Sequence, residues 1–581
     1  MKIFNKITYI ILLGSISLIG CKKEFLDVKP IGLATEVSFF STIDGVSDEV
    51  TASYAQLYPY ELMDVYYGID YGDAGSDDVE VGGSGTQDQP EVQNIDRMLH
   101  NAALTRPAAF YGYMYKGIRM ANTALYYIPK IKGDSSAAVL SRLKGEALFL
   151  RAFYHFCLAQ VYGGVVVVTD YVKDYTKTSR STLKETYSAI ESDLRAAIPL
   201  LQERSDMGAA NIGRATKSGA KAYLVKLLVY ESSYAKNYPG DDRFAGMLER
   251  WGEAATLGES IVTSGVYSLV GSNGEKFPSW WGSPNGTTQA GPFGNVNAFR
   301  WLFSVDGDNS TESIFEVQNV LDKGLYALTL GNYLTRYTTV KKVYGSAHEK
   351  GWGWNCPTVY LVSAFGNKDD RESNLHSTKG NPLDDPRFLT TIGRDSDSIY
   401  WSDDADKLKN MKWRKMHTID SPTGMLGRKF ECAPWEYFDV KVADGNSPYN
   451  IRLFRYADLL LLTAEAAFQS GDKTTALNYV NQIRTRARLA GSTGAPANLT
   501  DISYEDIIHE RRLELALEGH RFFDLMRWNL GPTMITGISI GLALNYNFTV
   551  SFTSDKNEFF PIPITQIQLT GGSILKQNPG Y

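Results

Sequence analysis

The chain has 581 residues and a formal net charge of −6, with 43% hydrophobic, 21% charged and 12% aromatic residues. This balance is ordinary for a globular protein with a sizeable core. A mildly acidic chain lacks the basic surface that nucleic-acid binding needs, so we exclude nucleic acid as a partner.

Residues 1–20 have the pattern of a lipoprotein signal peptide. Two lysines precede an apolar stretch over residues 7–19, which at roughly 13 residues is too short to span a bilayer. The stretch ends in Leu18-Ile19-Gly20-Cys21, which is similar to a bacterial lipoprotein cleavage box. We therefore expect cleavage before Cys21, lipid attachment at Cys21 and a tether over residues 21–40. Several acyl chains on one residue anchor a protein firmly to a membrane.

Apolar residues at helical spacing predict that residues 41–269 form an N-terminal helical part. Pro129 and Gly163-Gly164 mark the ends of the first two long segments, since neither residue type continues a helix well. The predicted helices cover residues 110–128, 141–162, 186–201, 218–230 and 251–264.

Residues 270–445 differ in composition from the segments on either side. Gly, Pro, Asn, Asp and Ser are frequent, helical periodicity is weak, and a short strand is predicted at 314–317. We predict a loop-rich insertion that carries the ligand site. The segment 306–312 lacks the ligand register and glycine of a calcium loop, so it is interpreted as a turn.

Residues 446–581 form the predicted C-terminal helical part and tail. One helix, with apolar residues nearly all round, ends at Gly471, and Asp472 then caps the next helix. The pair is similar to a tetratricopeptide repeat, and such units stack into a solenoid. The fold class is therefore mainly α, a tetratricopeptide-like helical repeat scaffold with a loop-rich insertion containing short strands. Ser503 is predicted to cap one last long helix that runs to Trp528.

Charged residues along 510–527 favour a structural role over catalysis. The predicted pairs, three residues apart, are Arg511–Glu514, Glu518–Arg521, Arg521–Asp524 and Asp524–Arg527. An arginine beside each carboxylate lowers its pKa and makes it a poor general acid near neutrality. We therefore predict an ion-pair network that fixes helix to helix.

No metal site or cofactor is expected from the sequence. Seven scattered histidines form no ligand cluster, and CxxC and HExxH motifs do not occur. Cys157 is interpreted as a core residue. A disulfide between Cys356 and Cys432 is neither required nor excluded by their spacing.

Tryptophan placement is the most informative signal for a binding site, because eight of the ten lie in the insertion. A flat aromatic ring covers the apolar C–H face of a sugar, while polar neighbours bind its hydroxyls. For Trp280 and Trp281, between prolines, binding is favoured over packing. For Trp352 and Trp354 both roles stay open, and for Trp413 and Trp435 packing is favoured. The predicted ligand-binding tryptophans are Trp280, Trp281, Trp301 and Trp352.

A second candidate surface contains Tyr71, Asp77 and Asp78, followed by a glycine-rich loop at 82–85. Carboxylates there are predicted to accept hydrogen bonds from vicinal hydroxyls. The alternative is an acidic loop without a ligand.

Four segments in this order carry a resemblance to a known family: Phe25-Leu26-Asp27 with Pro30, Gly145-Glu146-Ala147 to Tyr162-Gly163, Arg455-Tyr456-Ala457-Asp458 with Ala464-Glu465-Ala466, and Glu510-Arg511-Arg512 to Asn578-Pro579-Gly580-Tyr581. The chain resembles the SusD/RagB family, surface lipoproteins of Bacteroidetes glycan-uptake systems. The resemblance implies an oligosaccharide or polysaccharide ligand and a SusC-like TonB-dependent transporter as partner. It also implies a lipid-anchored position facing outward on the outer membrane, and no enzymatic activity.

Two other functions compete with glycan binding. A glycosidase needs two carboxyl groups opposed across a cleft, and no motif nominates such a pair. A peptide- or protein-binding scaffold of the same lipoprotein class is the alternative function, because helical arrays commonly bind peptides.

Overall fold

A computed structural model gives the fold. It describes residues 36–58, 62–83, 87–132, 137–171, 174–273, 298–320, 331–346, 351–366, 385–402, 411–418, 420–431, 447–489, 494–540 and 548–581.

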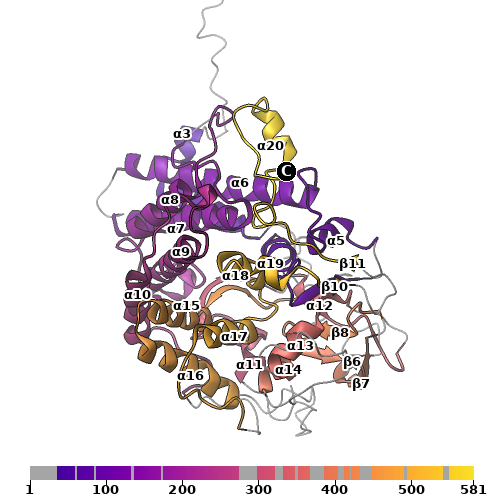
Figure 1. Ribbon diagram of the computed structural model, residues 1–581. Coiled ribbons are helices and arrows are strands. Elements are labelled where there is room, and N and C mark those ends of the chain that lie inside the picture. The colour runs from indigo at the N-terminus through magenta and orange to yellow at the C-terminus, as the bar shows by residue number, and fades with distance from the viewer. Residues whose placement is uncertain are drawn as a thin grey trace, which may run out of the picture.

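Helices that follow one another in the sequence pack side by side through the N-terminal part (Figure 1). They are α4 (Ile43–Ala55), α6 (Thr105–Tyr127), α7 (Ala137–Tyr162), α8 (Leu183–Ala197), α9 (Lys217–Asn237) and α10 (Trp251–Ser264). All five helices predicted in this part of the chain are present, and α10 has the predicted bounds. It ends there because Gly265 adopts a left-handed conformation at φ +69°.

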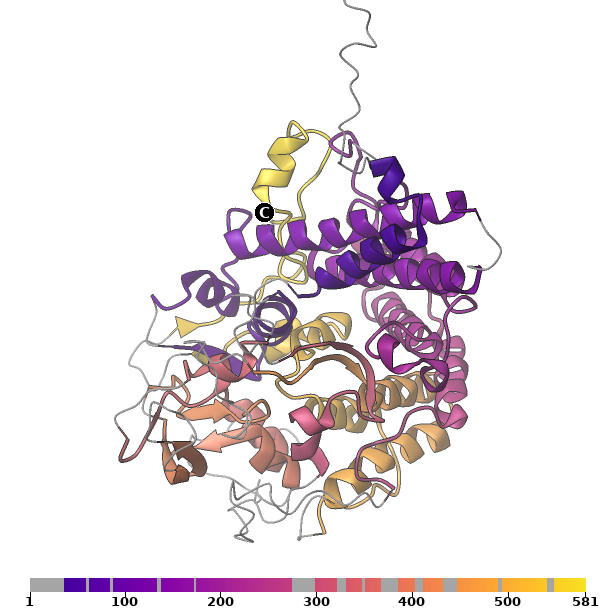
Figure 2. The same ribbon diagram turned by 180° about the vertical axis from the view of Figure 1, so that it is seen from behind.

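The helical stack continues across the insertion. Helix α10 packs against α15 (Tyr456–Gln469), and α15 packs in turn against α16 (Lys473–Leu489) and α17 (Tyr504–Glu514). Figure 2 shows these helices next to α9 and α10 from the other side. The chain has the predicted fold class, a mainly α, tetratricopeptide-like scaffold with few short strands.

The predicted last long helix is wrong in one respect, because it is broken in the middle. Ser503 forms the predicted capping box with Asp506, but α17 ends at Glu514 and α18 (Arg521–Arg527) starts anew. Between them Leu517 and Gly519 have φ of +64° and +76°, which a right-handed helix cannot contain.

The insertion contains short helices and strands, among them α11 (Ala298–Leu302), α12 (Leu334–Thr338), α13 (Val359–Gly366) and α14 (Pro386–Thr391). The predicted strand at 314–317 is β2 (Ser313–Val317), which pairs antiparallel with β9 (Ile451–Arg455) directly before α15. The other antiparallel pairings are β1 (Val79–Gly82) with β4 (Trp354–Pro357), β7 (Met411–His417) with β3 (Lys342–Val343) and β6 (Ser398–Ser402), β5 (Ile392–Arg394) with β8 (Met425–Gly427), and β10 (Ser539–Ile540) with β11 (Phe548–Thr549).

One large hydrophobic core joins the helices of both helical parts, while smaller clusters lie in the insertion. Helix α7 is buried on nearly every side, as its uninterrupted apolar composition requires. In the described part of the chain, no helix has the length and apolarity to cross a membrane.

Candidate functional site

Three aromatic rings and one guanidinium group meet at the junction of α12 and β4. The Tyr337 ring lies edge-on to both indoles, with its centroid 4.7 Å from that of Trp352 and 4.5 Å from that of Trp354. The guanidinium of Arg336 lies 5.0 Å from the Trp352 ring centroid, a cation–π distance. We call these four residues the Trp352 cluster. Tyr337 and Trp354 are almost fully buried, whereas Trp352 is half-buried and forms the outer member.

The backbone fixes this cluster from both sides. The Trp352 N–H donates to the Arg336 carbonyl at 2.8 Å, which holds the two residues together. Gly82 pairs with Trp354 in the β1–β4 ladder. The next residue, Gly83, has φ +85°, and a Cβ there would lie 2.9 Å from Trp354 Nε1. Gly82 and Gly83, the described part of the glycine-rich loop noted in the sequence, therefore pack directly against the Trp352 cluster.

A second aromatic group adjoins the first. Trp301 is half-buried and packs on a small core that includes Phe299 and Phe303. Phe430 belongs to the edge of both groups, since its ring lies 5.7 Å from Phe303 and 6.4 Å from Tyr449, a core partner of Trp354. The structure thus brings Trp301 and Trp352 to neighbouring clusters, each with part of its indole accessible.

The other predicted residues have different outcomes. Trp280, Trp281 and the predicted lipid-attachment residue Cys21 lie outside the described residues. Trp435 also lies outside them, and so does the side chain of Trp413. Cys356 is a buried free thiol, and Cys157 is buried and free as well.

The prediction of a second surface at Tyr71, Asp77 and Asp78 is wrong, because all three side chains are buried. Tyr71 is fully buried and packs edge-on against Phe110 and Phe560 in the main core. Asp77 and Asp78 are 2% and 1% exposed. Their carboxylates pair with arginines at the C-terminal end of α17 and the start of α18.

These arginine contacts explain the burial of the two aspartates. Arg521 Nε lies 2.7 Å from Asp77 Oδ1, and Arg512 Nη2 lies 2.6 Å from Asp78 Oδ1. Burial acts to raise the pKa of Asp77, but Arg512 and Arg521 outweigh it and the pKa is lowered. Nothing in the sequence links residue 77 to residue 521, so the partner was not predictable from spacing.

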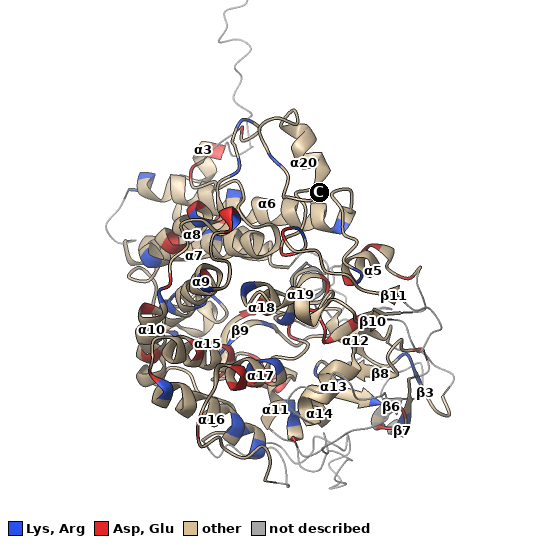
Figure 3. Cartoon of the chain, viewed as in Figure 1, with Lys and Arg blue, Asp and Glu red and all other residues tan. Residues whose placement is uncertain are grey.

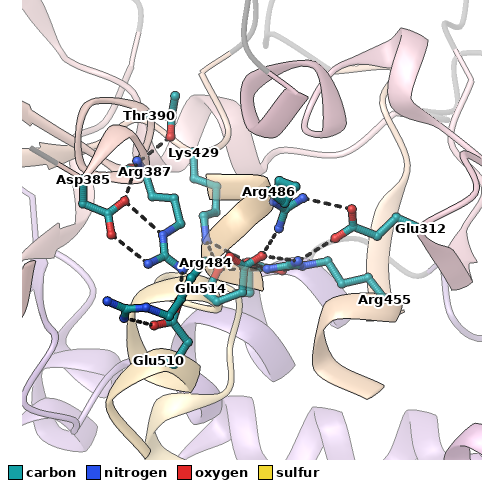
Figure 4. A network of polar contacts seen from close by, with 11 residues as sticks. Glu312, Asp385, Arg387, Thr390, Lys429, Arg455, Arg484, Arg486, Glu510 and Glu514 are labelled. Carbon is teal, nitrogen blue, oxygen red and sulfur yellow. Dashed lines mark hydrogen bonds and ion pairs between the residues drawn. The ribbon is translucent and has the colours of Figure 1, made fainter. Parts of the chain in front are cut away.

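Glu510 and Glu514 of α17 belong to a buried ion-pair network (Figure 4). Glu514 lies at its centre and forms ion pairs with Arg455 at 2.7 Å, with Arg387 at 3.1 Å and with Arg486. Burial acts to raise the pKa of Glu514, but these guanidinium groups outweigh it and hold the pKa far below its ordinary value. The predicted structural role is therefore confirmed.

Most of the predicted partners within this network are wrong. Of the four predicted pairs only Asp524–Arg527 forms, at 2.8 Å. Arg511 pairs with Asp458 and Asp524, and Glu518 pairs with Arg455 and Lys429. The broken helix places these side chains against other elements. Residues of both signs also lie side by side along α8 (Figure 3).

Two carboxyl groups have pKa values raised to about 7 by burial, those of Asp73 and Asp96. Both side chains are almost fully buried, at 1% and 3% exposure, and Asp73 lines a small cavity of about 50 Å³. Among the described residues, no group of three His, Cys, Asp or Glu side chains has a metal-binding arrangement.

Sequence reasoning missed Arg336, Tyr337 and Phe430 as members of the aromatic surface. A Tyr or Phe in a loop-rich segment is too common to single out by composition. Arg336 and Tyr337 come well before Trp352 in the sequence. Only the fold of the insertion brings the three side chains together.

The helical stack and the inserted region with its aromatic clusters define a helical-repeat protein with a loop-rich insertion. Comparison with known proteins gives its family. The chain belongs to the SusD family: one family model, described as SusD family, matches residues 311–581. A second model, described as starch-binding and associating with the outer membrane, matches residues 24–229. The resemblance noted in the sequence is confirmed.

Individual relatives match over nearly the whole chain. SusD-like protein P2 of Formosa agariphila is 25% identical and aligns over 99% of both chains. The crystal structure of a SusD-like protein from Bacteroides fragilis superposes with a TM-score of 0.70 at 22% identity, covering 94% of this chain and 98% of the other. Surface glycan-binding protein A from Bacteroides thetaiotaomicron, in complex with laminarihexaose, superposes with a TM-score of 0.65 at 20% identity, covering 92% and 99%.

Proposed function

We propose that this chain is a cell-surface glycan-binding lipoprotein. It is anchored through Cys21 to the outer membrane, facing outward, and captures oligosaccharides without chemical change. It then delivers them to a SusC-like TonB-dependent transporter. The observation that carries the ligand class is the half-buried Trp352 indole, held by Tyr337, Trp354 and Arg336.

The geometry suits a sugar for physical reasons. A ring whose back is packed and whose front is partly open offers a flat apolar face that loses little conformational entropy on binding. Arg336 next to that ring supplies N–H donors for hydroxyl oxygens at its edge. Trp301 lies on the adjoining cluster and extends the same kind of surface. Trp280 and Trp281 remain proposed ligand contacts on the basis of the sequence.

Family membership supports the proposal. Two relatives are described by their glycans, a laminarin-binding SusD-like protein and the laminarihexaose complex mentioned above. The pKa values of the ion-paired carboxylates Glu514 and Asp458 lie below their ordinary range, which argues against a general-acid role.

Affinity electrophoresis in gels that contain laminarin or starch tests the proposal with the purified full chain. Trp352→Ala is expected to weaken retention, and the dissociation constant for the matching hexasaccharide should rise by about tenfold or more, equivalent to about 1.4 kcal/mol. The control is Tyr344→Ala, which removes a 45% exposed ring outside the cluster. Equal retention of wild type and Trp352→Ala contradicts the site, and release of shorter sugars contradicts the non-enzymatic function.

A further inference from the structure

A groove far from the Trp352 cluster in the sequence lies between α6, the described residues 165–171 and 174–178, and α20 (Ile564–Leu569). It encloses a volume of about 490 Å³, within the roughly 300–1,000 Å³ that is common for small-molecule sites. Four tyrosines line it, Tyr111, Tyr115, Tyr171 and Tyr175. In Figure 1, α6 and α20 lie at the end of the molecule where the described chain begins, on the opposite side of the scaffold from α13 and α14.

One of the lining tyrosines is accessible, and a second exposed ring lies next to the groove. Tyr175 is 51% exposed and Tyr126, at the far end of α6, is 44% exposed. The Tyr126 ring stacks on Tyr171 with centroids 4.8 Å apart and planes inclined by 19°. Leu569 on α20 is 64% exposed and faces the same groove. Exposed apolar side chains that gather at one place indicate a binding surface, whereas single ones are common.

Hydrogen bonds hold the walls of the groove in place. Tyr115 donates its hydroxyl to the Val166 carbonyl at 2.8 Å, and Asn122 donates its amide to the Val168 carbonyl at 2.9 Å. Arg151 donates to the Asn122 amide oxygen at 2.6 Å. These bonds tie the segment that follows α7 to α6, so the groove is formed before any ligand arrives.

The lining of the groove includes an exposed glycine that packing does not explain. Gly112 lies within α6, and a Cβ there would meet no atom within 4 Å. A glycine inside a helix costs about 0.5–1 kcal/mol relative to alanine. The missing side chain at Gly112 leaves this part of the lining open next to Tyr111 and Tyr115.

The charges at the rim balance. Lys116 and Arg119 on α6 face Asp170 and Asp174 on the segment that follows α7, and all four side chains are exposed. A strongly anionic or cationic ligand gains little at such a rim, whereas a neutral polyhydroxylated ligand finds donors and acceptors next to flat rings.

We propose that this tyrosine-lined groove is a second oligosaccharide-binding site, specific for a neutral glycan chain. The inference rests on the proposed glycan-binding function and adds a site that shares no residue with the Trp352 cluster. Two sites on one body retain a polysaccharide more tightly than either alone, because binding at the second site becomes intramolecular.

Gly112→Trp tests the site, since a Cβ at Gly112 would meet no atom within 4 Å and the bulky side chain is added at the groove lining. The matched control is Gly252→Trp on α10, another exposed helical glycine whose Cβ would meet no atom within 4 Å. Calorimetric titration of the full chain with laminarihexaose and maltohexaose counts the sites. Tyr175→Ala is a second variant that removes an exposed ring instead of filling the groove.

The expected result is two sites in the wild type and in Gly252→Trp, and one site in Gly112→Trp. Tyr175→Ala is expected to weaken the second site by about tenfold, the factor that corresponds to about 1.4 kcal/mol. A single site in the wild type, removed by Trp352→Ala and unaffected by Gly112→Trp, overturns this inference and leaves the proposed function standing. Binding that Gly112→Trp removes and Trp352→Ala does not affect supports the groove and contradicts the Trp352 site. No binding of either sugar to the wild type overturns both.

Discussion

Asp73 accepts a hydrogen bond from the backbone N–H of Gly519 at 3.0 Å and so joins two segments that lie 446 residues apart. Its other carboxylate oxygen accepts a bond from the Asn355 amide at 3.0 Å. One buried side chain therefore connects the N-terminal part, the insertion and the break between α17 and α18.

Gly519→Ala is expected to destabilise the protein by about 1–3 kcal/mol or more, because the residue has φ +76° and its Cβ would lie 2.7 Å from the Gly68 Cα. Gly537→Ala is the control, since Gly537 also has positive φ but its Cβ would meet no atom within 4 Å. Denaturant unfolding of both variants measures the difference. Equal losses in the two variants contradict a role for the close approach to Gly68.

The stability of the protein is expected to depend on the protonation of Asp73. Burial raises its pKa from 3.8 to about 7, so between these values the folded state binds a proton that the unfolded state has released. Its contribution to stability is fully present below about pH 4 and is lost as pH rises towards 7. Asp73→Asn removes this proton, and the slope of unfolding free energy between pH 5 and 7 should become less negative by about 1 kcal/mol per pH unit. An unchanged slope contradicts the assignment.

Arg455→Met is expected to cost about 3–5 kcal/mol, because it removes one cation shared by Glu514, Glu312 and Glu518 and leaves one net negative charge in the buried network. The control is Arg195→Met, whose ion pairs with Glu191 and Glu253 lie at the surface and contribute about 0–1 kcal/mol. Thermal and denaturant unfolding compare the two variants. Similar small losses would show that the buried network has little influence on stability.

Ligand binding at the Trp352 cluster is expected to stabilise the folded state. At a free hexasaccharide concentration of about 100 times the dissociation constant, the gain is about 2.7 kcal/mol by mass action. Differential scanning fluorimetry with and without the sugar measures it as a rise in melting temperature. Trp352→Ala should lose most of this rise while Tyr344→Ala keeps it. The melting temperature of each variant without sugar separates a change in folding from a change in binding.

Local signals in the sequence predicted most of the scaffold. Gly471 marked the end of α15 and Ser503 the start of α17, because caps are encoded within a few residues. The break after Glu514 was not predictable, since it depends on the contact of Gly519 with Gly68. Helical spacing remained favourable through that point, so the pattern alone predicted one helix.

The binding surface was predictable only in part, for a similar reason. Trp301 and Trp352 stood out because tryptophans are concentrated in the insertion, and both proved half-buried in adjoining clusters. The carboxylates of Asp77 and Asp78 suggested an accessible acidic loop. Their neutralisation by Arg512 and Arg521 depends on a tertiary contact that no local pattern encodes.

The direct packing of α10 against α15 has a consequence for how such a protein diversifies. Since these helices are in contact, the insertion between them leaves the helical stack and returns to it at one place. Loops within the insertion can then be lengthened, shortened or exchanged while the contact between α10 and α15 is kept. A different ligand preference can therefore arise from changes in the loops of the insertion. Arg387 and Arg455 are constrained, because both pair with the buried Glu514.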